Sequence, residues 1–104
     1  MKKVIDGVLY NTETATEIAS DSYSNPSDFN HWEEVLYRTK KGSWFLLGSG
    51  GPSSRYSVSI DTNSWSGSND NIAPLEPREA MQWLERAEEH DLILEHFADL
   101  VREA

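Results

Sequence analysis

Residues 31–51 read HWEEVLYRTKKGSWFLLGSGG and contain two of the four tryptophans of the chain. Aromatic and β-branched residues are dense enough here to favour strands over helices. The segment predicts two strands, Trp32 to Thr39 and Ser43 to Gly48, joined by a tight turn at Lys40-Lys41-Gly42. Gly42 supplies the positive φ that a short hairpin loop needs. We therefore place this hairpin at the centre of the predicted sheet.

Side chains alternate along both predicted strands, because successive residues of a strand point to opposite faces. In the first strand, the residues of one face are Glu33, Val35, Tyr37 and Thr39, and those of the other are Trp32, Glu34, Leu36 and Arg38. In the second strand, one face carries Trp44 and Leu46, and the other carries Phe45 and Leu47. This period of two is typical of a strand.

The chain before the hairpin carries a turn signal and a helix-capping signal. Asp6-Gly7 lies between two short apolar runs and predicts a small hairpin. Thr14 with Glu17 three residues later fits a capping box and predicts one or two helical turns through Ile18. Residues 20–30 are rich in Ser, Asn and Asp, and predict a loop with a short edge strand around Ser22-Tyr23.

The chain from residue 49 to residue 71 predicts a loop, a strand and a connection. GSGGPSS, residues 48–54, is predicted to be a loop, and Arg55 to Ile60 alternates as a third strand of the sheet would. Residues 61–71 are polar apart from Trp65 and predict a mobile connection.

Two helices are predicted at the C-terminal end. Pro77 suits a first helical position, and Glu79 favours a helix N-terminus. From Arg78 to Glu89, one broad apolar face contains Ala80, Met81, Trp83, Leu84 and Ala87. Asp91 can cap a second helix, whose apolar face would contain Ile93, Leu94, Phe97, Leu100 and Val101. The sequence thus predicts an α+β fold: an antiparallel sheet of three to five strands with two C-terminal helices packed on one face.

Length and composition limit the class of protein. A chain of 104 residues forms one domain with a modest core. The absence of cysteine excludes disulfides, thiolate zinc sites and thiol nucleophiles. No apolar run is long enough for a secretory leader or a membrane span, so we expect a cytoplasmic protein without a membrane partner.

The charge balance points to the kind of partner. Nine basic and eighteen acidic residues give a net charge of −9. Nucleic-acid affinity depends on cationic surface, so we expect no direct contact with DNA or RNA. A basic protein surface, such as a groove that normally holds nucleic acid, would be attracted. The alternative is that the acidity serves solubility alone.

No catalytic, cofactor or metal-binding motif is found in the sequence. Gly48, Gly50 and Gly51 are followed by no lysine of a phosphate-binding loop. His90 and His96 lie six residues apart, which does not place them on one helical face for a metal. An enzyme would need a concealed acid/base site with His31 or His96. We expect a protein that is not an enzyme and needs neither metal nor cofactor.

The acidic residues are concentrated near the C-terminus. Residues 76–104 hold nine carboxylates and three arginines, a net charge of −6. Four of the carboxylates recur every fourth residue from Asp91 to Glu103. On one continuous helix they would form a row with steps of about 6 Å, similar to the phosphate spacing along a strand. The predicted partner-binding residues are Glu85, Glu88, Glu89, Asp91, Glu95, Asp99 and Glu103. An ordinary solvated helix face is the alternative interpretation.

A second possible binding surface is aromatic. It consists of Tyr37, Trp44, Phe45 and Tyr56 on a face of the sheet. A small accessory or regulatory protein could bind its partner through such a face, and salt would then matter little.

Three segments carry a family resemblance: LYNTET at residues 9–14, EEVLYRTKKG at 33–42 and PLEPREAMQWLE at 74–85. With them, residues 4–85 resemble a family of small bacterial proteins of phages and mobile elements, some of which look like anti-CRISPR inhibitors. The resemblance implies a non-catalytic inhibitor in the cytoplasm of a bacterial host cell. Its partner would be a CRISPR Cas effector complex, whose DNA-recognition surface it would cover with carboxylates in place of phosphates, as a DNA mimic. No catalytic residue is implied.

Overall fold

The structure, a computed structural model, describes residues 1–25, 27, 29–50, 58–61, 64–66 and 68–104, and for residues 58–70 it describes the strands alone. The elements in chain order are β1 (Lys2–Ile5), β2 (Val8–Asn11), β3 (Thr16–Tyr23), β4 (Trp32–Arg38), β5 (Trp44–Gly50), β6 (Val58–Asp61), β7 (Ser64–Ser66), β8 (Ser68–Leu75), α1 (Pro77–Arg86), α2 (His90–His96) and the 3₁₀ turn η1 (Ala98–Leu100).

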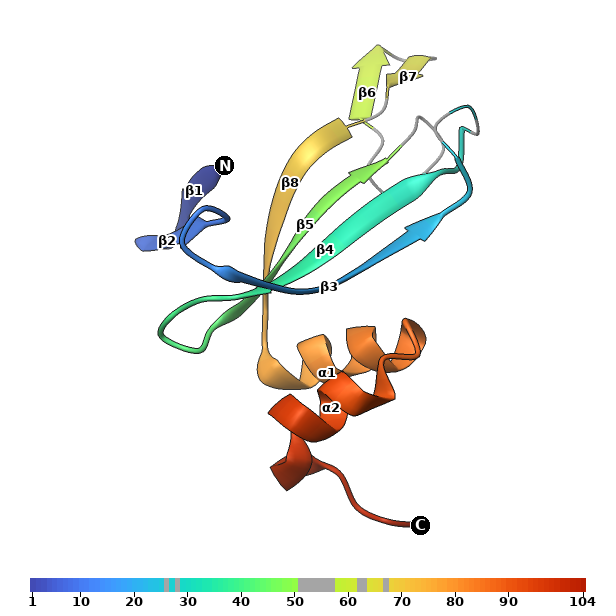
Figure 1. Cartoon of the computed structure of the whole chain (residues 1–104). Helices are drawn as coiled ribbons and strands as arrows, with labels where there is room; N and C mark the ends of the chain where they lie inside the picture. The colour runs from blue at the N-terminus through green and yellow to red at the C-terminus, as the bar shows by residue number, and fades with distance from the viewer. Residues whose placement is uncertain (26, 28, 51–57, 62–63, 67) are drawn as a thin grey trace.

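The main sheet has four antiparallel strands in the order β3-β4-β5-β8. Helices α1 and α2 lie on one face of this sheet (Figure 1). The pairs β1-β2 and β6-β7 form two separate two-stranded sheets. The predicted α+β fold, with its C-terminal helices on one face, is therefore confirmed.

The central hairpin is confirmed as well. Strands β4 and β5 pair with Leu36 opposite Leu46 and Tyr37 opposite Phe45. At the turn, the Thr39 N–H donates to the Ser43 carbonyl at 2.8 Å, and Gly42 has φ +90°. A side chain at Gly42 would therefore be placed in the left-handed region that glycine adopts without strain.

Replacing Gly42 by alanine is expected to lower the free energy of unfolding by about 1–3 kcal/mol, the cost of a sparsely populated backbone conformation. The added Cβ would lie 3.5 Å from Arg38 Nη2, an ordinary contact, so backbone strain and not a clash is the cause. Urea unfolding measures the change. The exposed neighbour Ser43 replaced by alanine serves as the control, and an equal loss there would contradict the explanation.

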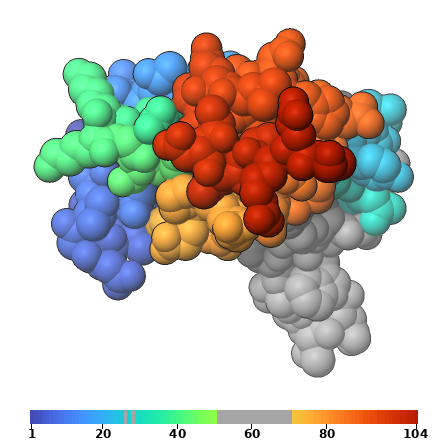
Figure 2. Space-filling view, turned by 90° about the horizontal axis from the view of Figure 1, so that it is seen from below, coloured from blue at the N-terminus to red at the C-terminus, as the bar shows by residue number. Residues whose placement is uncertain are grey.

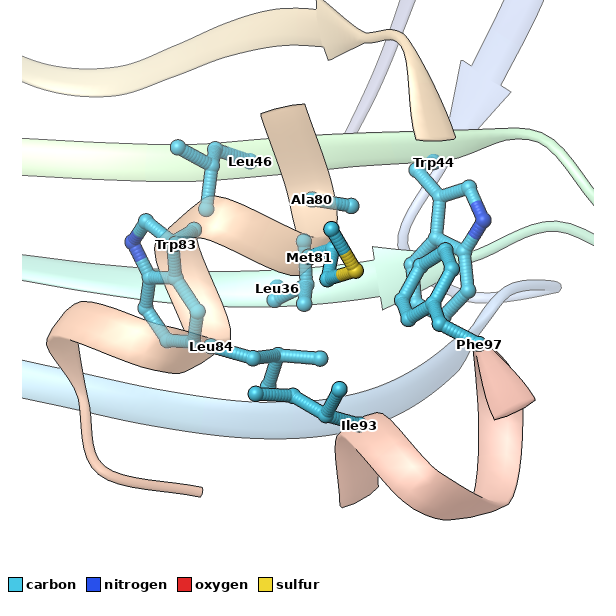
Figure 3. Close-up of a cluster of buried hydrophobic side chains, with 9 residues drawn as sticks. All are labelled: Leu36, Trp44, Leu46, Ala80, Met81, Trp83, Leu84, Ile93 and Phe97. Carbon is cyan, nitrogen blue, oxygen red and sulfur yellow. The ribbon is translucent and has the colours of Figure 1, made fainter. Parts of the chain in front are cut away.

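The hydrophobic core lies between the sheet and the helices (Figure 3). From the sheet it contains Leu36, Trp44 and Leu46, and from the helical side Ala80, Met81, Trp83, Leu84, Ile93 and Phe97. Trp44 and Phe97 have ring centroids 5.0 Å apart, and this contact joins the end of α2 to β5. Helix α1 begins at Pro77 as predicted, and the Glu76 N–H donates to Glu79 Oε1 at 2.8 Å.

The opposite face of the sheet has a smaller aromatic cluster. Phe45 is fully buried there, stacked on Tyr37 with a centroid distance of 5.1 Å. Tyr10 of β2 meets Phe45 edge-on at 5.5 Å. The β1-β2 hairpin, which Asp6-Gly7 predicts correctly, therefore packs onto this face through Tyr10.

The capping box predicted at Thr14 and Glu17 is wrong. The chain from Thr16 to Tyr23 is strand β3, an edge strand paired with β4, and its range includes the predicted edge strand at Ser22-Tyr23. The Thr14 and Ala15 N–H groups instead donate to the Asn11 carbonyl in a turn. Pairing with the exposed edge of β4 satisfies a whole strand of backbone groups, which outweighs a two-turn helix in solvent.

The third strand predicted from Arg55 to Ile60 is also wrong in its place in the sheet. Residues 55–57 lie outside the described residues, and Val58–Asp61 pairs with β7 in its own hairpin. The strand next to β5 is β8, Ser68–Leu75, whose first half was predicted to belong to a mobile connection. Its edge position accommodates Pro74, which has no N–H to donate.

Candidate protein-binding surface

The seven predicted partner-binding residues lie on the side of the molecule that the helices form. Glu85 is on α1, Asp91 and Glu95 are on α2, and Asp99 is on η1. Glu88 and Glu89 connect the two helices, and Glu103 lies beyond η1. Six of the seven are exposed and Glu89 is half-buried. Figure 2 shows these elements covering one side of the molecule, and we call the seven residues the acidic helical surface.

Neighbouring basic side chains leave this surface largely unneutralised. Within the described residues, the contact of this surface with a basic side chain is between Glu95 Oε2 and His96 Nε2, at 3.0 Å, and it is an ion pair only when the imidazole is protonated. Among the residues that the structure describes, no ion pair joins these carboxylates to the arginines of the same segment, Arg78, Arg86 and Arg102. Exposed like charges without counter-ions create a negative potential that attracts a basic partner.

The evenly spaced row of carboxylates is a wrong prediction. Helix α2 ends at His96, Asp99 belongs to the 3₁₀ turn, and Glu103 lies in a segment without regular structure. Leu100 and Val101, predicted to face the core, are exposed, as is Leu94. A helix in water continues only while its apolar face is covered, and beyond Phe97 nothing covers it within the described residues.

A half-buried cation, Arg38, holds the end of α2 against the sheet. Arg38 Nη1 lies 3.3 Å from His96 Nδ1, and the guanidinium lies 5.1 Å from the centre of the Trp44 ring. An arginine can only donate, so we assign His96 Nδ1 as the acceptor and its Nε2–H as the donor to Glu95. This chain of contacts fixes the position of Glu95 on the acidic helical surface.

The aromatic binding surface is not available in the predicted form. Trp44 and Phe45 point to opposite faces of the sheet, and both are buried. Tyr37 is half-buried against Phe45, and Tyr56 lies outside the described residues. Adjacent residues of one strand cannot share a face, so no single aromatic face can contain both Trp44 and Phe45.

Among the residues whose exposure the structure describes, the exposed aromatic side chains lie near the β3–β4 connection. Phe29 is 68% exposed and Tyr23 is 53% exposed. Tyr23 stacks on Trp32, its partner across the two strands, at 6.4 Å. Sequence reasoning missed the Tyr23–Trp32 stack because it treated residues 20–30 as a loop with a short edge strand, and it took its aromatic surface from Tyr37, Trp44, Phe45 and Tyr56.

A buried carboxylate also escaped the sequence analysis. Glu34 is only 1% exposed, and Trp83 Nε1 of α1 donates to its Oε1 at 3.0 Å. Asp21 and Arg86 line a cavity of about 170 Å³ beside the pair. Strand alternation places Glu34 on the core face with Leu36, and this is the signal that could have revealed it. The hydrogen bond joins helix α1 to the centre of the sheet.

Tyr37 is expected to make the folded protein less stable at alkaline pH. Burial, and then the Glu17 carboxylate, raise the pKa of its phenol above the usual 10.0. Above that value the unfolded chain loses the proton first, so the native state binds more protons and stability falls as pH rises. Urea unfolding across this range measures the fall, and Tyr37→Phe should reduce it. An identical pH profile for the variant would contradict the assignment.

Within the described residues, no group of three or more His, Asp or Glu side chains is arranged to hold a metal ion, and no helix has the length and apolarity needed to cross a membrane. Comparisons with protein-family models, curated proteins and solved structures find no match.

Proposed function

We propose that this chain is a non-catalytic inhibitor of the anti-CRISPR type. In this proposal it acts in the cytoplasm of a bacterial host and binds a basic, nucleic-acid-handling protein, a CRISPR Cas effector complex. The acidic helical surface makes the contact and keeps DNA from its recognition site. The observation that carries the proposal is the exposure of carboxylates that the arginines of the same segment leave unpaired within the described residues.

The loss of the regular row changes the mechanism that we propose. Spacing like that of phosphates would let carboxylates replace a DNA strand position by position, and the ends of α2 and η1 rule out one straight row. The acidic helical surface acts instead through its summed field, which raises the association rate and favours basic partners. Binding of this kind weakens steeply as salt screens the charges.

A pull-down from a bacterial host lysate tests the proposal. The immobilised chain should retain a nucleic-acid-binding protein at low salt and release it at high salt. Addition of the free chain to that purified protein should then block its binding to DNA. Retention that is insensitive to salt, or a retained protein whose DNA binding is unchanged, would contradict the proposal.

The alternative, binding of a partner through an aromatic surface, requires other residues than those predicted. The Tyr23–Trp32 stack and Phe29 offer the exposed aromatic area that protein interfaces favour. A small accessory module would use them with little salt dependence. The same pull-down separates the two candidates, because Phe29→Ala would then release a partner that high salt does not.

A further inference from the structure

A groove of about 410 Å³ lies between two turns of the molecule. One wall contains Val8 and Leu9, next to the β1–β2 turn, and the other contains Thr39, Lys40 and Lys41 of the β4–β5 turn. Val8 is 47% exposed and Leu9 is 54% exposed. Figure 2 shows the two turns side by side, in blue and green. The groove thus combines an apolar wall with two lysines in a chain that is acidic overall.

The C-terminal segment, residues 99–103, is apolar at its centre and acidic at its two ends. Its two carboxylates and the exposed Arg102 give it a net charge of −1. Leu100 and Val101 are 42% and 38% exposed, and Asp99 and Glu103 flank them as exposed carboxylates. Val101 has φ −97° and ψ 137°, an extended backbone. Figures 1 and 2 both place this segment apart from the groove, beyond α2, so the groove of the same molecule is not its site.

We propose that the groove binds residues 99–103 of a second copy of this chain. Lys40 and Lys41 would face the carboxylates of Asp99 and Glu103, and the aliphatic wall would cover Leu100 and Val101. Both the charge and the apolar area of the groove find complements in one segment of the same chain. The two surfaces differ, so the contact is heterologous and joins copies head to tail.

Salt alone is a poor test of this contact. It screens the attraction between the groove and the segment, but it also screens the repulsion between two copies that each carry a net charge of −9. A decisive test instead reverses the charges of the groove in one variant and those of the segment in another. Each variant alone then pairs like charges, whereas a mixture of the two pairs opposite charges again.

Sedimentation equilibrium over a concentration series is the experiment. The wild-type mass should rise above 11.8 kDa with concentration. Lys40→Glu with Lys41→Glu, and separately Asp99→Lys with Glu103→Lys, should each weaken association by at least about tenfold, because like charges then meet in the groove. An equimolar mixture of the two variants should regain association, since each groove then faces a segment of opposite charge.

The matched control is Lys2→Glu with Lys3→Glu, which changes the net charge equally but lies on β1, outside the lining of the groove. It should weaken association clearly less than the change at Lys40 and Lys41. A wild-type mass of one chain at every concentration, equal effects of the two lysine pairs, or a mixture that stays monomeric would each overturn the proposal. None of these results would bear on binding to a basic partner.

Discussion

Replacing Glu85 and Glu88 by lysine is expected to weaken binding to the basic partner by at least about tenfold at low salt. Both side chains are exposed, Glu85 in the last turn of α1 and Glu88 just beyond the helix, and neither has an ion-pair partner among the described residues. The change reverses two charges of the acidic helical surface. Binding and inhibition, measured against salt concentration, should show both the loss and a flatter salt dependence.

The fold should tolerate this change. Cations near the C-terminus of a helix interact favourably with its dipole, so stability should stay within about 0.5 kcal/mol of wild type. The matched control is Glu13→Lys with Glu33→Lys, which makes the same change in net charge at exposed positions away from α1 and α2. Equal losses in the two variants would mean that only net charge matters, and the acidic helical surface would lose its role.

Replacing Phe45 by alanine is expected to cost about 3–5 kcal/mol of unfolding free energy. The side chain is fully buried, stacked on Tyr37 and met edge-on by Tyr10. Its removal leaves a cavity between the main sheet and the β1-β2 hairpin. A domain of this size has only about 5–15 kcal/mol in total, so the variant should unfold at much lower urea concentration.

Phe29 provides the control for the same substitution. It is 68% exposed, so Phe29→Ala should change stability by no more than about 0.5 kcal/mol. Similar losses for Phe29 and Phe45 would contradict the packing described for the second face of the sheet. If Phe45→Ala lowers the unfolding free energy but leaves the environment of Tyr10 unchanged, the β1-β2 hairpin packs on the sheet by other contacts.

The acidic helical surface could be predicted from the sequence only in part. Which residues are acidic, and that most are exposed, follows from composition and helical periodicity. Their arrangement does not, because the end of α2 depends on whether the sheet extends far enough to cover Leu100 and Val101. The groove next to Lys40 and Lys41 was also beyond sequence reasoning, since it forms where two turns far apart in the chain meet.

The sequence by itself determined the elements whose signals are local. A glycine at positive φ, an Asp-Gly turn, an alternating pattern and a proline at a helix start act within a few residues, and they place β4, β5, the β1-β2 hairpin and α1. Only the tertiary structure decided the neighbours of the central hairpin. A segment such as Thr16–Tyr23 or Ser68–Leu75 has weak preferences of its own, and it becomes a strand because pairing with β4 or β5 satisfies its backbone hydrogen bonds.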